Sequence, residues 1–438
     1  MTHLRVTPHD ARARRYIQKR HRERTLRRRD MRISPLITAF APELRRWRHH
    51  LHRYPELGFE ETKTAQFIAD KLQAMPGVKV STHVGVTGVV ASITGKRQSN
   101  ARTVGLRADM DALPMQETRT GRPYESCHPG VMHGCGHDGH STMLLGAARH
   151  LAVDLDRDFA GTVHCIFQPA EEGRGGALKM IADGLFDRFA CDEVYALHNW
   201  PGMRVGHVDA QAGPRMASSD NFDIRIVTRG GHAALPHLTQ DPIVIGSHVV
   251  TALQSVVSRV IDPVDPVVLS VTRMHAGTEA YNVIPSSAHL AGTLRCFSAD
   301  VRKAVPVHVE RIVRNLAKAW DAEASVEWNA QGKHPLRSEV GYPPTVNAAH
   351  QAMLAYKAAV AVVGADKVAD NAPASMTAED FSVLLEHRPG AYIWLGAGEK
   401  TFPLHHPSYD FNDDLLPIGT ALLSQIALFS LAQPVNVA

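Results

Sequence analysis

Residues 132–140 read MHGCGHDGH, and residues 168–173 read QPAEEG. Hydrophobic periodicity predicts a helix over residues 139–151, beginning at the end of the first stretch, and a strand over residues 161–167, ending just before the second. Strands and helices alternate around both stretches, which predicts an α/β domain with helices packed on a central sheet. The two stretches therefore place cysteine, histidine and glutamate side chains where regular elements begin and end.

The same alternation continues on both sides of these stretches. Its other members are helices from residue 42 and over residues 60–74 and 175–182, and strands over residues 86–93, 104–107 and 193–197. It resumes later with helices over residues 347–363 and 378–387 and a strand over residues 391–395. We expect residues 31–214 and 331–438 to form two parts of one domain.

Residues 215–330 follow a different pattern and are predicted to form an inserted satellite domain. The expected elements are a strand over residues 222–226, a helix over 241–261, strands over 266–274 and 287–296, a helix over 300–320 and a strand over 324–328. This βαββαβ order is that of the ferredoxin-like unit.

Length and composition agree with a two-domain globular chain. The 438 residues are 44% hydrophobic and 21% charged, and so long a chain exceeds what one core usually holds. The apolar runs are interrupted before the roughly 20 residues that a membrane span needs, so no membrane association is expected. Five cysteines, an odd number, do not suggest a disulfide framework and favour a cytoplasmic location.

The basic charge is confined to residues 1–30, which hold 11 Lys and Arg against 3 acidic residues, whereas the rest holds 37 against 41. Three interpretations of this tail stay open. Translation begins at Met31, which we favour, or the tail is a solvated extension, or it is an arm for nucleic acid or a membrane surface. The mildly acidic remainder gives no electrostatic case for nucleic acid as a partner.

Candidate chemical groups occur in four clusters and one later loop. Three of the four clusters lie just past the carboxyl end of a predicted strand, where ligands bind in open α/β sheets. The clusters are Asp109 with Asp111, Cys135 with His137, Glu171 with Glu172, and His198, and the loop adds His405 or His406.

Each cluster alone has an ordinary structural explanation, such as a solvated surface for Glu171 and Glu172 or a hydrogen-bonded structural role for His198. Together they form a mixed nitrogen, sulfur and oxygen set that suits a borderline divalent ion. Adjacent glutamates in an extended loop point to different sides, so one can bind a metal while the other serves as a general base. The combination indicates metal-assisted hydrolysis.

These residues resemble the amidohydrolase branch of the co-catalytic two-metal aminopeptidase-fold family, which includes hippurate hydrolases, auxin-conjugate hydrolases and N-acyl-amino-acid amidohydrolases. The resemblance spans about residues 42–414. It implies an α/β, two-domain metallopeptidase-type fold whose α/β domain is catalytic. The stretches that carry it are RRWRHHLHRYPELGFEE, GLRADMDALPMQE, MHGCGHDGHSTMLLGAA, FQPAEEGRGGA, ALHNWPG, TRGGHAALPH, YNVIP, GTLR, AEDFS and LHHPSYDFND.

The resemblance also implies roles for individual residues. Two divalent ions per subunit (Mn, Zn, Ni or Co) are expected on the ligands Cys135, His137, Glu172, His198 and His406. Glu171 is the implied general base, and Asp111 the residue that orients a metal ligand. Distant relatives have a histidine ligand where this chain has Asp109, so contact between Asp109 and metal stays open. The choice between His405 and His406 also stays open, although the position relative to PSYDF favours His406.

In the satellite domain, the resemblance implies that His232 reaches the active site of a partner subunit and stabilises the oxyanion. Asn282 and Arg295 would hold the substrate carboxylate, which the planar fork of arginine suits. Without the resemblance, Arg295 would be taken for a surface arginine. A homodimer or homotetramer is expected.

The predicted function is metal-dependent hydrolysis of N-acyl-L-amino acids, with hippurate-like small molecules as substrates. A dipeptidase or carboxypeptidase is the alternative enzyme, although no acidic partner for a free amine stands out. A nucleic-acid-binding protein with an inactive body, or a metal-buffering protein, are the non-enzymatic alternatives. Every metal and base position is filled, which favours the enzyme.

Deleting residues 1–30 should leave metal-dependent hydrolysis and the melting temperature unchanged, because these residues lie outside every stretch that carries the resemblance. The comparison is between the full chain and a chain beginning at Met31. Loss of folding or of activity in the shorter protein would show that the tail has a function.

Overall fold

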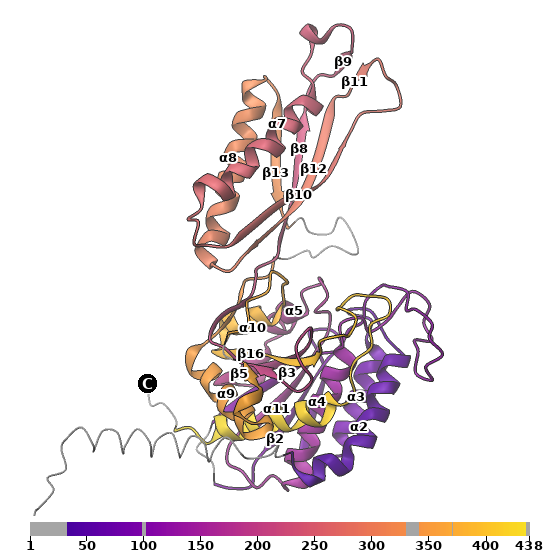
Figure 1. Cartoon of the computed structure of the whole chain (residues 1–438), viewed down its shortest axis with the longest axis vertical. Coiled ribbons are helices and arrows are strands. Elements are labelled where there is room, and N and C mark those ends of the chain that lie inside the picture. Colours follow the sequence, from indigo (N-terminus) through magenta and orange to yellow (C-terminus); the bar gives the residue numbers. More distant parts are fainter. Residues whose placement is uncertain (1–32, 99–101, 330–340, 370, 435–438) are drawn as a thin grey trace, which may run out of the picture.

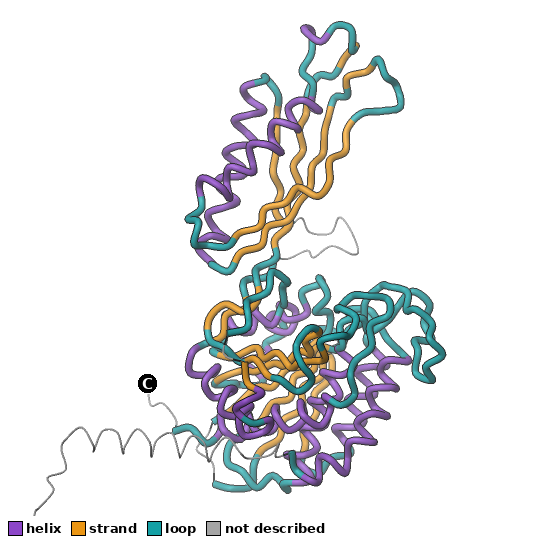
Figure 2. The backbone as a smooth tube through the Cα atoms, viewed as in Figure 1, coloured by secondary structure: helices purple, strands orange, loops and turns teal. Residues whose placement is uncertain are grey.

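The computed structural model describes residues 33–98, 102–329, 341–369 and 371–434. The chain forms a larger α/β domain and a smaller satellite domain that extends away from it (Figure 1). Coloured by secondary structure, the larger domain has a strand layer between helices, and the satellite has its helices on one side of its strands (Figure 2). The fold predicted from the sequence is confirmed.

An eight-stranded mixed sheet organises the larger domain. β3 pairs in parallel with β4 and β5, and β16 pairs in parallel with β5, so the carboxyl ends of these four strands meet at one edge. The sheet order is β1 (Val78–Val84), β2 (Gly88–Thr94), β4 (Thr162–Gln168), β3 (Thr103–Asp109), β5 (Glu193–Pro201), β16 (Gly390–Gly398), β6 (Val208–Asp209) and β15 (Val368–Ala369).

Helices cover both faces of this sheet. One face packs against α2 (Pro35–Arg53), α3 (Thr62–Gln73), α4 (His137–Arg149), α9 (Ala349–Val363) and α11 (Leu415–Leu431), and the other against α5 (Gly176–Ala182), α6 (Leu185–Arg188) and α10 (Phe381–His387). Helix α4 lies deepest, with every residue except Arg149 buried. Its close contact requires glycine at position 139, where a Cβ would lie 2.2 Å from the Phe411 ring.

The satellite domain has the predicted βαββαβ order. Its elements are β8 (Asp220–Val227), α7 (Pro242–Ser255), β10 (Val267–Ala276), β12 (Ser287–Cys296), α8 (Ala299–Ala319) and β13 (Glu323–Trp328), and its antiparallel sheet has the order β10-β12-β8-β13. A short ladder of β9 (Gly231–His232) and β11 (Val283–Ile284) lies at the end farthest from the larger domain (Figure 1).

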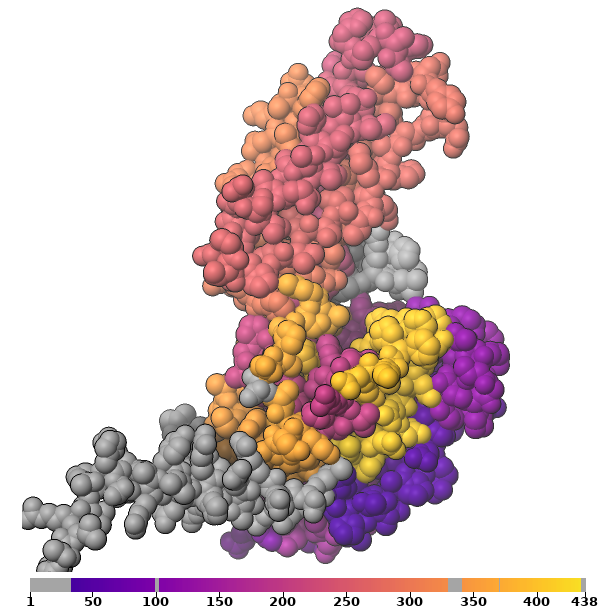
Figure 3. Space-filling view, in the orientation of Figure 1, coloured from indigo at the N-terminus to yellow at the C-terminus, as the bar shows by residue number. Residues whose placement is uncertain are grey.

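Two segments connect the domains and pair with each other. β7 (Gly213–Met216) pairs with β14 (Thr345–Asn347), and Ser219 bridges Tyr342. In the space-filling view the two domains meet through a narrow region (Figure 3). The boundaries predicted at residues 214 and 330 remain predictions, and the second, like the tail of residues 1–30, lies outside the described residues.

One helix does not fit the expectation that every apolar segment is too short to span a membrane. Pro242–Val260 is long and apolar enough to cross a membrane by length and composition alone. The expectation was based on uninterrupted apolar runs. The mean hydropathy of the helix, in contrast, stays high despite isolated polar residues such as His248. Its residues Ile245, Val249 and Leu253 are fully buried against the satellite sheet, the spacing of one helix face.

Several elements depart from the predicted pattern. α2 begins at Pro35 and contains Pro42, where the helix was expected to begin. Seven short elements were not predicted, namely α6, β6, β7, β9, β11, β14 and β15. β1 was not predicted either, and only its last residue, Val84, is buried, which explains why its hydrophobic signal is weak. α11 was also missed, because a helix buried nearly all round lacks amphipathic periodicity. β5 continues to Pro201 through its parallel pairing with β16, so His198 lies inside the strand and not beyond its end.

Candidate active site

The edge where β3 and β4 end carries the acidic side chains. Asp109 is the last residue of β3 and pairs with Gln168, the last residue of β4. The loop after β4 turns back over the sheet edge, since Ala170 and Gly173 have φ of 53° and 77°. Glu171 and Glu172 in this loop therefore lie beside the residues that follow β3.

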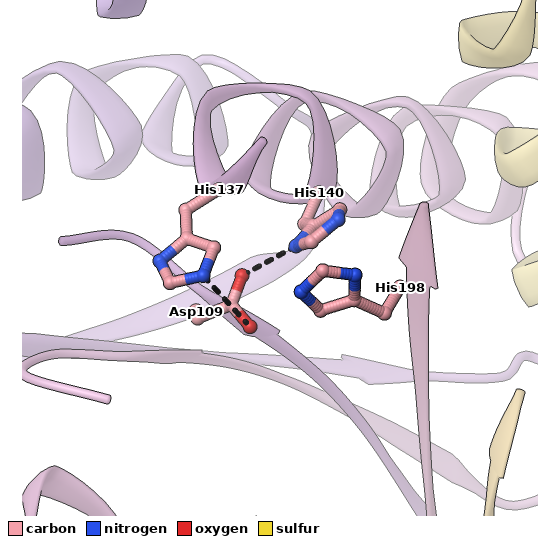
Figure 4. A group of neighbouring side chains, drawn as sticks. All are labelled: Asp109, His137, His140 and His198. Atoms are coloured by element: carbon pink, nitrogen blue, oxygen red, sulfur yellow. Dashed lines mark hydrogen bonds and ion pairs between the residues drawn. The ribbon is translucent and has the colours of Figure 1, made fainter. Parts of the chain in front are cut away.

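The segment entering α4 supplies thiol and imidazole groups to the same edge. Gly136 between Cys135 and His137 has φ 94°, and a Cβ there would lie 1.9 Å from Asn199 Oδ1, so the tight turn requires glycine. His137 and His140, three residues apart, lie on one face of the helix. Figure 4 shows both imidazoles directed toward Asp109, with His198 of β5 approaching from the other side.

In the described part of the chain, the donor atoms form three groups, each with its members within 4.8 Å of one another. Glu171, Glu379 and Asp380 make up one, and the other two share His137. One comprises Asp109, His137, His140 and His198, and the other Cys135, His137 and Glu172. Cys135 Sγ lies 3.5 Å from His198 Nε2, and His137 Nε2 lies 3.9 Å from Glu172 Oε1. The structure thus brings Cys135, His137, Glu172 and His198 together, as the sequence predicted.

Two buried polar atoms at the centre of this cluster lack a hydrogen-bond partner, although Glu172 Oε1 forms an ion pair with His405 Nε2 at 3.2 Å. Among the described residues, neither His137 Nε2 nor Glu172 Oε1 has a hydrogen-bond partner. An unsatisfied buried polar atom costs on the order of 1–3 kcal/mol, so the pair indicates a missing positive group between them. A divalent cation fits this mixed donor set.

Asp111 fixes the orientation of this pair. His137 Nδ1 lies 2.9 Å from Asp111 O and 3.2 Å from Asp111 Oδ1, and the Glu172 backbone N–H donates to Asp111 Oδ2 at 2.9 Å. Carboxylate contact at the second ring nitrogen is the usual arrangement behind a metal-binding histidine. Asp111 is therefore placed to orient His137, the role that the family resemblance implies.

The electrostatics of the cluster also favour a cation. Burial, followed by the nearby Glu379 and Glu172, raises the pKa of Glu171 well above its ordinary value. Burial and the same crowding by Glu172 raise the pKa of the Cys135 thiol. A bound cation opposes both shifts because it stabilises the carboxylate and thiolate forms.

His140 was missed by the sequence analysis. Its Nδ1 lies 2.6 Å from Asp109 Oδ1 (Figure 4), and its Nε2 lies 3.0 Å from Asn199 Oδ1. With both nitrogens engaged, His140 is placed to orient Asp109. The available signal was its spacing of three residues from His137.

Arg107 and the acidic pair of AEDFS were missed as well. The buried Arg107 guanidinium lies 2.7 Å from Asp109, 2.9 Å from Glu379 and 3.1 Å from Asp380. The Asp380 backbone N–H donates to Glu171 Oε1 at 3.3 Å. This one cation therefore offsets the carboxylates under the site and supports the residues around the predicted base.

The loop histidine prediction is corrected by the structure. His405 Nε2 lies 3.2 Å from Glu172 Oε1, whereas the His406 ring stacks on Phe402 and its Nδ1 accepts from the Ser408 N–H. The reason is local backbone geometry, since His405 has φ 62° and its N–H donates to Gly134 O, which turns its side chain toward the site. His405 replaces His406 as the candidate ligand.

A pocket of about 480 Å³ opens at this cluster and extends to the satellite domain. Arg295 of β12 is part of its lining, with Nη1 donating to Ser219 Oγ at 2.6 Å. Apolar lining comes from Trp200, Met216, Met376 and Leu404. His232 and Asn282, which were predicted to serve the site, lie together in the distant ladder region of the same chain and do not line this pocket (Figure 1).

His405→Ala should weaken the binding of one of two divalent ions by at least about tenfold, the smallest loss typical even for an indirect partner of a metal. His406→Ala is the matched control and should retain both ions, because its ring packs on Phe402. Metal content after dialysis measures both. Metal loss in His406→Ala alone would restore the original assignment.

Comparison with known proteins gives consistent similarities. Residues 105–428 match the model of peptidase family M20/M25/M40. The chain is 38% identical over 398 residues to a hippurate hydrolase of Campylobacter jejuni, covering 91% of this chain and 99% of that one. It is 43% identical over 316 residues to an N-acyl-L-amino acid amidohydrolase of Geobacillus stearothermophilus, covering 72% and 80%. The crystal structure of a dinuclear metal binding peptidase of the M20 family from Bacillus subtilis is similar with a TM-score of 0.76 and 32% identity, covering 90% and 99%.

Proposed function

This chain belongs to peptidase family M20/M25/M40, and on that premise we propose that it hydrolyses hippurate-like N-acyl-L-amino acids to a carboxylate and a free amino acid. The predicted family resemblance is confirmed, and the chain is a metal-dependent amidohydrolase that deacylates N-acyl amino acids. The observation that carries the proposal is the pocket joining the donor cluster and Glu171 to Arg295.

The substrate class follows from the two kinds of lining. Arg295 interacts electrostatically with Asp220, but the Asp220 carboxylate already accepts two hydrogen bonds from Arg302. The Arg295 guanidinium is therefore suited to bind a substrate carboxylate. Trp200 stacks on Trp394 with ring centroids 3.9 Å apart, so its indole is a rigid wall of the pocket. Such a wall favours an aromatic acyl group.

The relatives support the same class while leaving the acyl group open. A hippurate hydrolase and an N-acyl-L-amino acid amidohydrolase are both similar over most of this chain. Dipeptide hydrolysis has less support. Glu379 lines the pocket, but its carboxylate already accepts from Arg107 and from the Tyr392 hydroxyl, so it is poorly placed to bind a free amine.

Different residues of the site are proposed to bind the metal ions and to transfer the proton. When bound, the metal ions polarise the amide carbonyl and lower the pKa of water. Cys135, His137, Glu172, His198 and His405 would hold these ions, which we propose to be two per subunit and drawn from Mn, Zn, Ni and Co. Glu171 takes the proton from the attacking water and delivers it to the leaving nitrogen. Its low exposure of 7% keeps that proton from bulk solvent.

The far end of the satellite domain is proposed to complete the site of a second subunit. His232 lies exposed there, beside the fully exposed Tyr281 and the 64% exposed Leu238. Edge strand β10 pairs on one side only among the described residues, so a second copy could extend the sheet. We propose a homodimer, or a homotetramer built from such pairs, in which His232 and Asn282 act in the partner's pocket.

The five free cysteines fit a reducing compartment, and we propose a cytoplasmic enzyme.

A substrate panel tests the proposed function directly. The metal-loaded protein should cleave hippurate faster than N-acetylglycine, since only the benzoyl group contacts the Trp200 wall. It should cleave glycylglycine at least tenfold more slowly than either, because the free ammonium group of the dipeptide would be buried without a counter-ion. The free-energy cost of that burial exceeds the change in activation free energy that corresponds to a tenfold change in rate. Fastest cleavage of the dipeptide would favour the dipeptidase alternative. Equal rates with and without chelator would contradict metal dependence.

Substitution of the two adjacent glutamates, one at a time, should have different effects. Glu171→Gln should keep both metals but lower kcat by at least about 10²-fold, the scale of a general base. Glu172→Gln should lower metal content, because its oxygen faces His137. Metal analysis and turnover of the two variants together make the distinction. Metal loss in Glu171→Gln alone would reverse the two roles.

Donation of His232 between subunits predicts complementation. His232→Ala should be metal-loaded yet lose about 10² to 10³ in kcat, as for a lost oxyanion donor. Mixed with Glu171→Gln subunits, it should recover roughly a quarter of wild-type activity, since about half of randomly mixed dimers hold one intact site. No recovery after confirmed subunit exchange would mean that His232 acts in its own chain or not at all.

A further inference from the structure

We propose that Tyr342 is a positioning residue that couples recognition of the substrate carboxylate by Arg295 to the placement of the general base Glu171. The inference rests on the proposed function, because it takes Arg295 as the carboxylate-binding group. It assigns a role to the segment that connects the two domains. No residue of this segment takes part in the proposed reaction steps.

The Tyr342 side chain is fixed to the loop that carries the base. Its ring is buried, with 4% exposure, and its hydroxyl donates to Glu171 O at 3.1 Å and accepts from the Gly175 N–H at 3.1 Å. The loop turns through positive φ at residues 170, 173 and 175 before α5 begins. A hydroxyl that bridges both ends of this loop therefore helps to set the position of Glu171.

The Tyr342 backbone is fixed to the other connecting segment. Its N–H donates to Ser219 O at 2.8 Å, and the Ser219 N–H donates back to Tyr342 O at 2.9 Å. Ser219 directly precedes β8, the first strand of the satellite sheet. The two chain segments that connect the domains are therefore held together at these residues.

Ser219 completes the connection to the carboxylate-binding group. Arg295 Nη1 donates to Ser219 Oγ at 2.6 Å, and both residues line the pocket together with Tyr342 and Glu171. Direct contacts thus run from Arg295 through Ser219 and Tyr342 to the backbone of Glu171. A carboxylate that binds Arg295 competes with Ser219 for the same guanidinium donors. Its binding therefore changes the hydrogen bond from Arg295 to Ser219.

The physical consequence is that carboxylate binding acts on turnover. Binding energy from a non-reacting part of a substrate raises kcat when it helps to order the catalytic groups. A substrate without the carboxylate leaves the contacts between Arg295 and Glu171 unchanged. Tyr342 should therefore matter more for the acid than for its uncharged amide.

Tyr342→Phe tests this, because it keeps the ring and removes only the hydroxyl. The substrates are the acid and the primary amide of the best-cleaved N-acyl amino acid. We expect kcat for the acid to fall about tenfold, the scale of one or two lost hydrogen bonds, with KM changed less than about twofold. For the amide, kcat should fall by a smaller factor, because the hydroxyl still helps to hold the Glu171 loop but no carboxylate acts on Arg295. Tyr356→Phe, on the half-exposed side of α9, is the matched control and should change neither.

A double-mutant cycle and a measurement without turnover distinguish coupling from local support. Ser219→Ala combined with Tyr342→Phe should cost the acid no more kcat than the larger single effect. Amide hydrogen exchange over residues 170–176 should slow when the metal-loaded wild type binds the free amino acid product, and this protection should be lost in Tyr342→Phe.

Equal losses for acid and amide, additive effects in the cycle, or product protection that survives in Tyr342→Phe would overturn the inference. The failure of the proposed function is separate, because it appears in the wild type. There it takes the form of no cleavage of any N-acyl amino acid, or equal cleavage of the acid and its amide.

Discussion

The burial of several carboxylates at one edge of the sheet is the constraint on which the rest of the structure depends. Each buried ion must recover several kcal/mol of lost hydration from opposite charge and hydrogen bonds. Arg107 supplies part of this, through contacts of 2.7–3.1 Å with Asp109, Glu379 and Asp380. The remaining demand is visible at His137 Nε2, which has no hydrogen-bond partner among the described residues and faces carboxylate oxygens 3.8 and 3.9 Å away. Divalent cations in this account therefore complete the fold of the site as well as its chemistry.

The sheet topology explains how distant segments meet this demand. Parallel pairing of β3 with β4 and β5 brings three strand ends to one edge, and α4 supplies its thiol and imidazole groups across them. The satellite domain adds Arg295 to the same pocket, whereas its exposed far end carries His232 away from it. One chain therefore holds the proposed metal-binding and proton-transfer groups of a site and presents further groups on a separate surface.

Much of this could be predicted from sequence because the signals were local. Strand ends in an α/β sheet share an edge, so Glu171, Glu172 and the residues near Asp109 could be placed together before any coordinates. Contacts made by the tertiary fold could not, since Arg107 and Asp380 are 273 residues apart. The wrong choice of His406 has a similar cause. The direction of neighbouring histidines depends on one positive φ, at His405, which spacing does not reveal.

Anomalous scattering from crystals of the manganese-loaded protein tests the central claim most directly. Two manganese peaks per chain are expected, about 3.5–4 Å apart as in other two-metal sites, in the space enclosed by Cys135, His137, Glu172 and His198. A single peak, or peaks outside this cluster, would contradict it. So would an empty cluster in which His137 Nε2 and Glu172 Oε1 have closed into a hydrogen bond with each other.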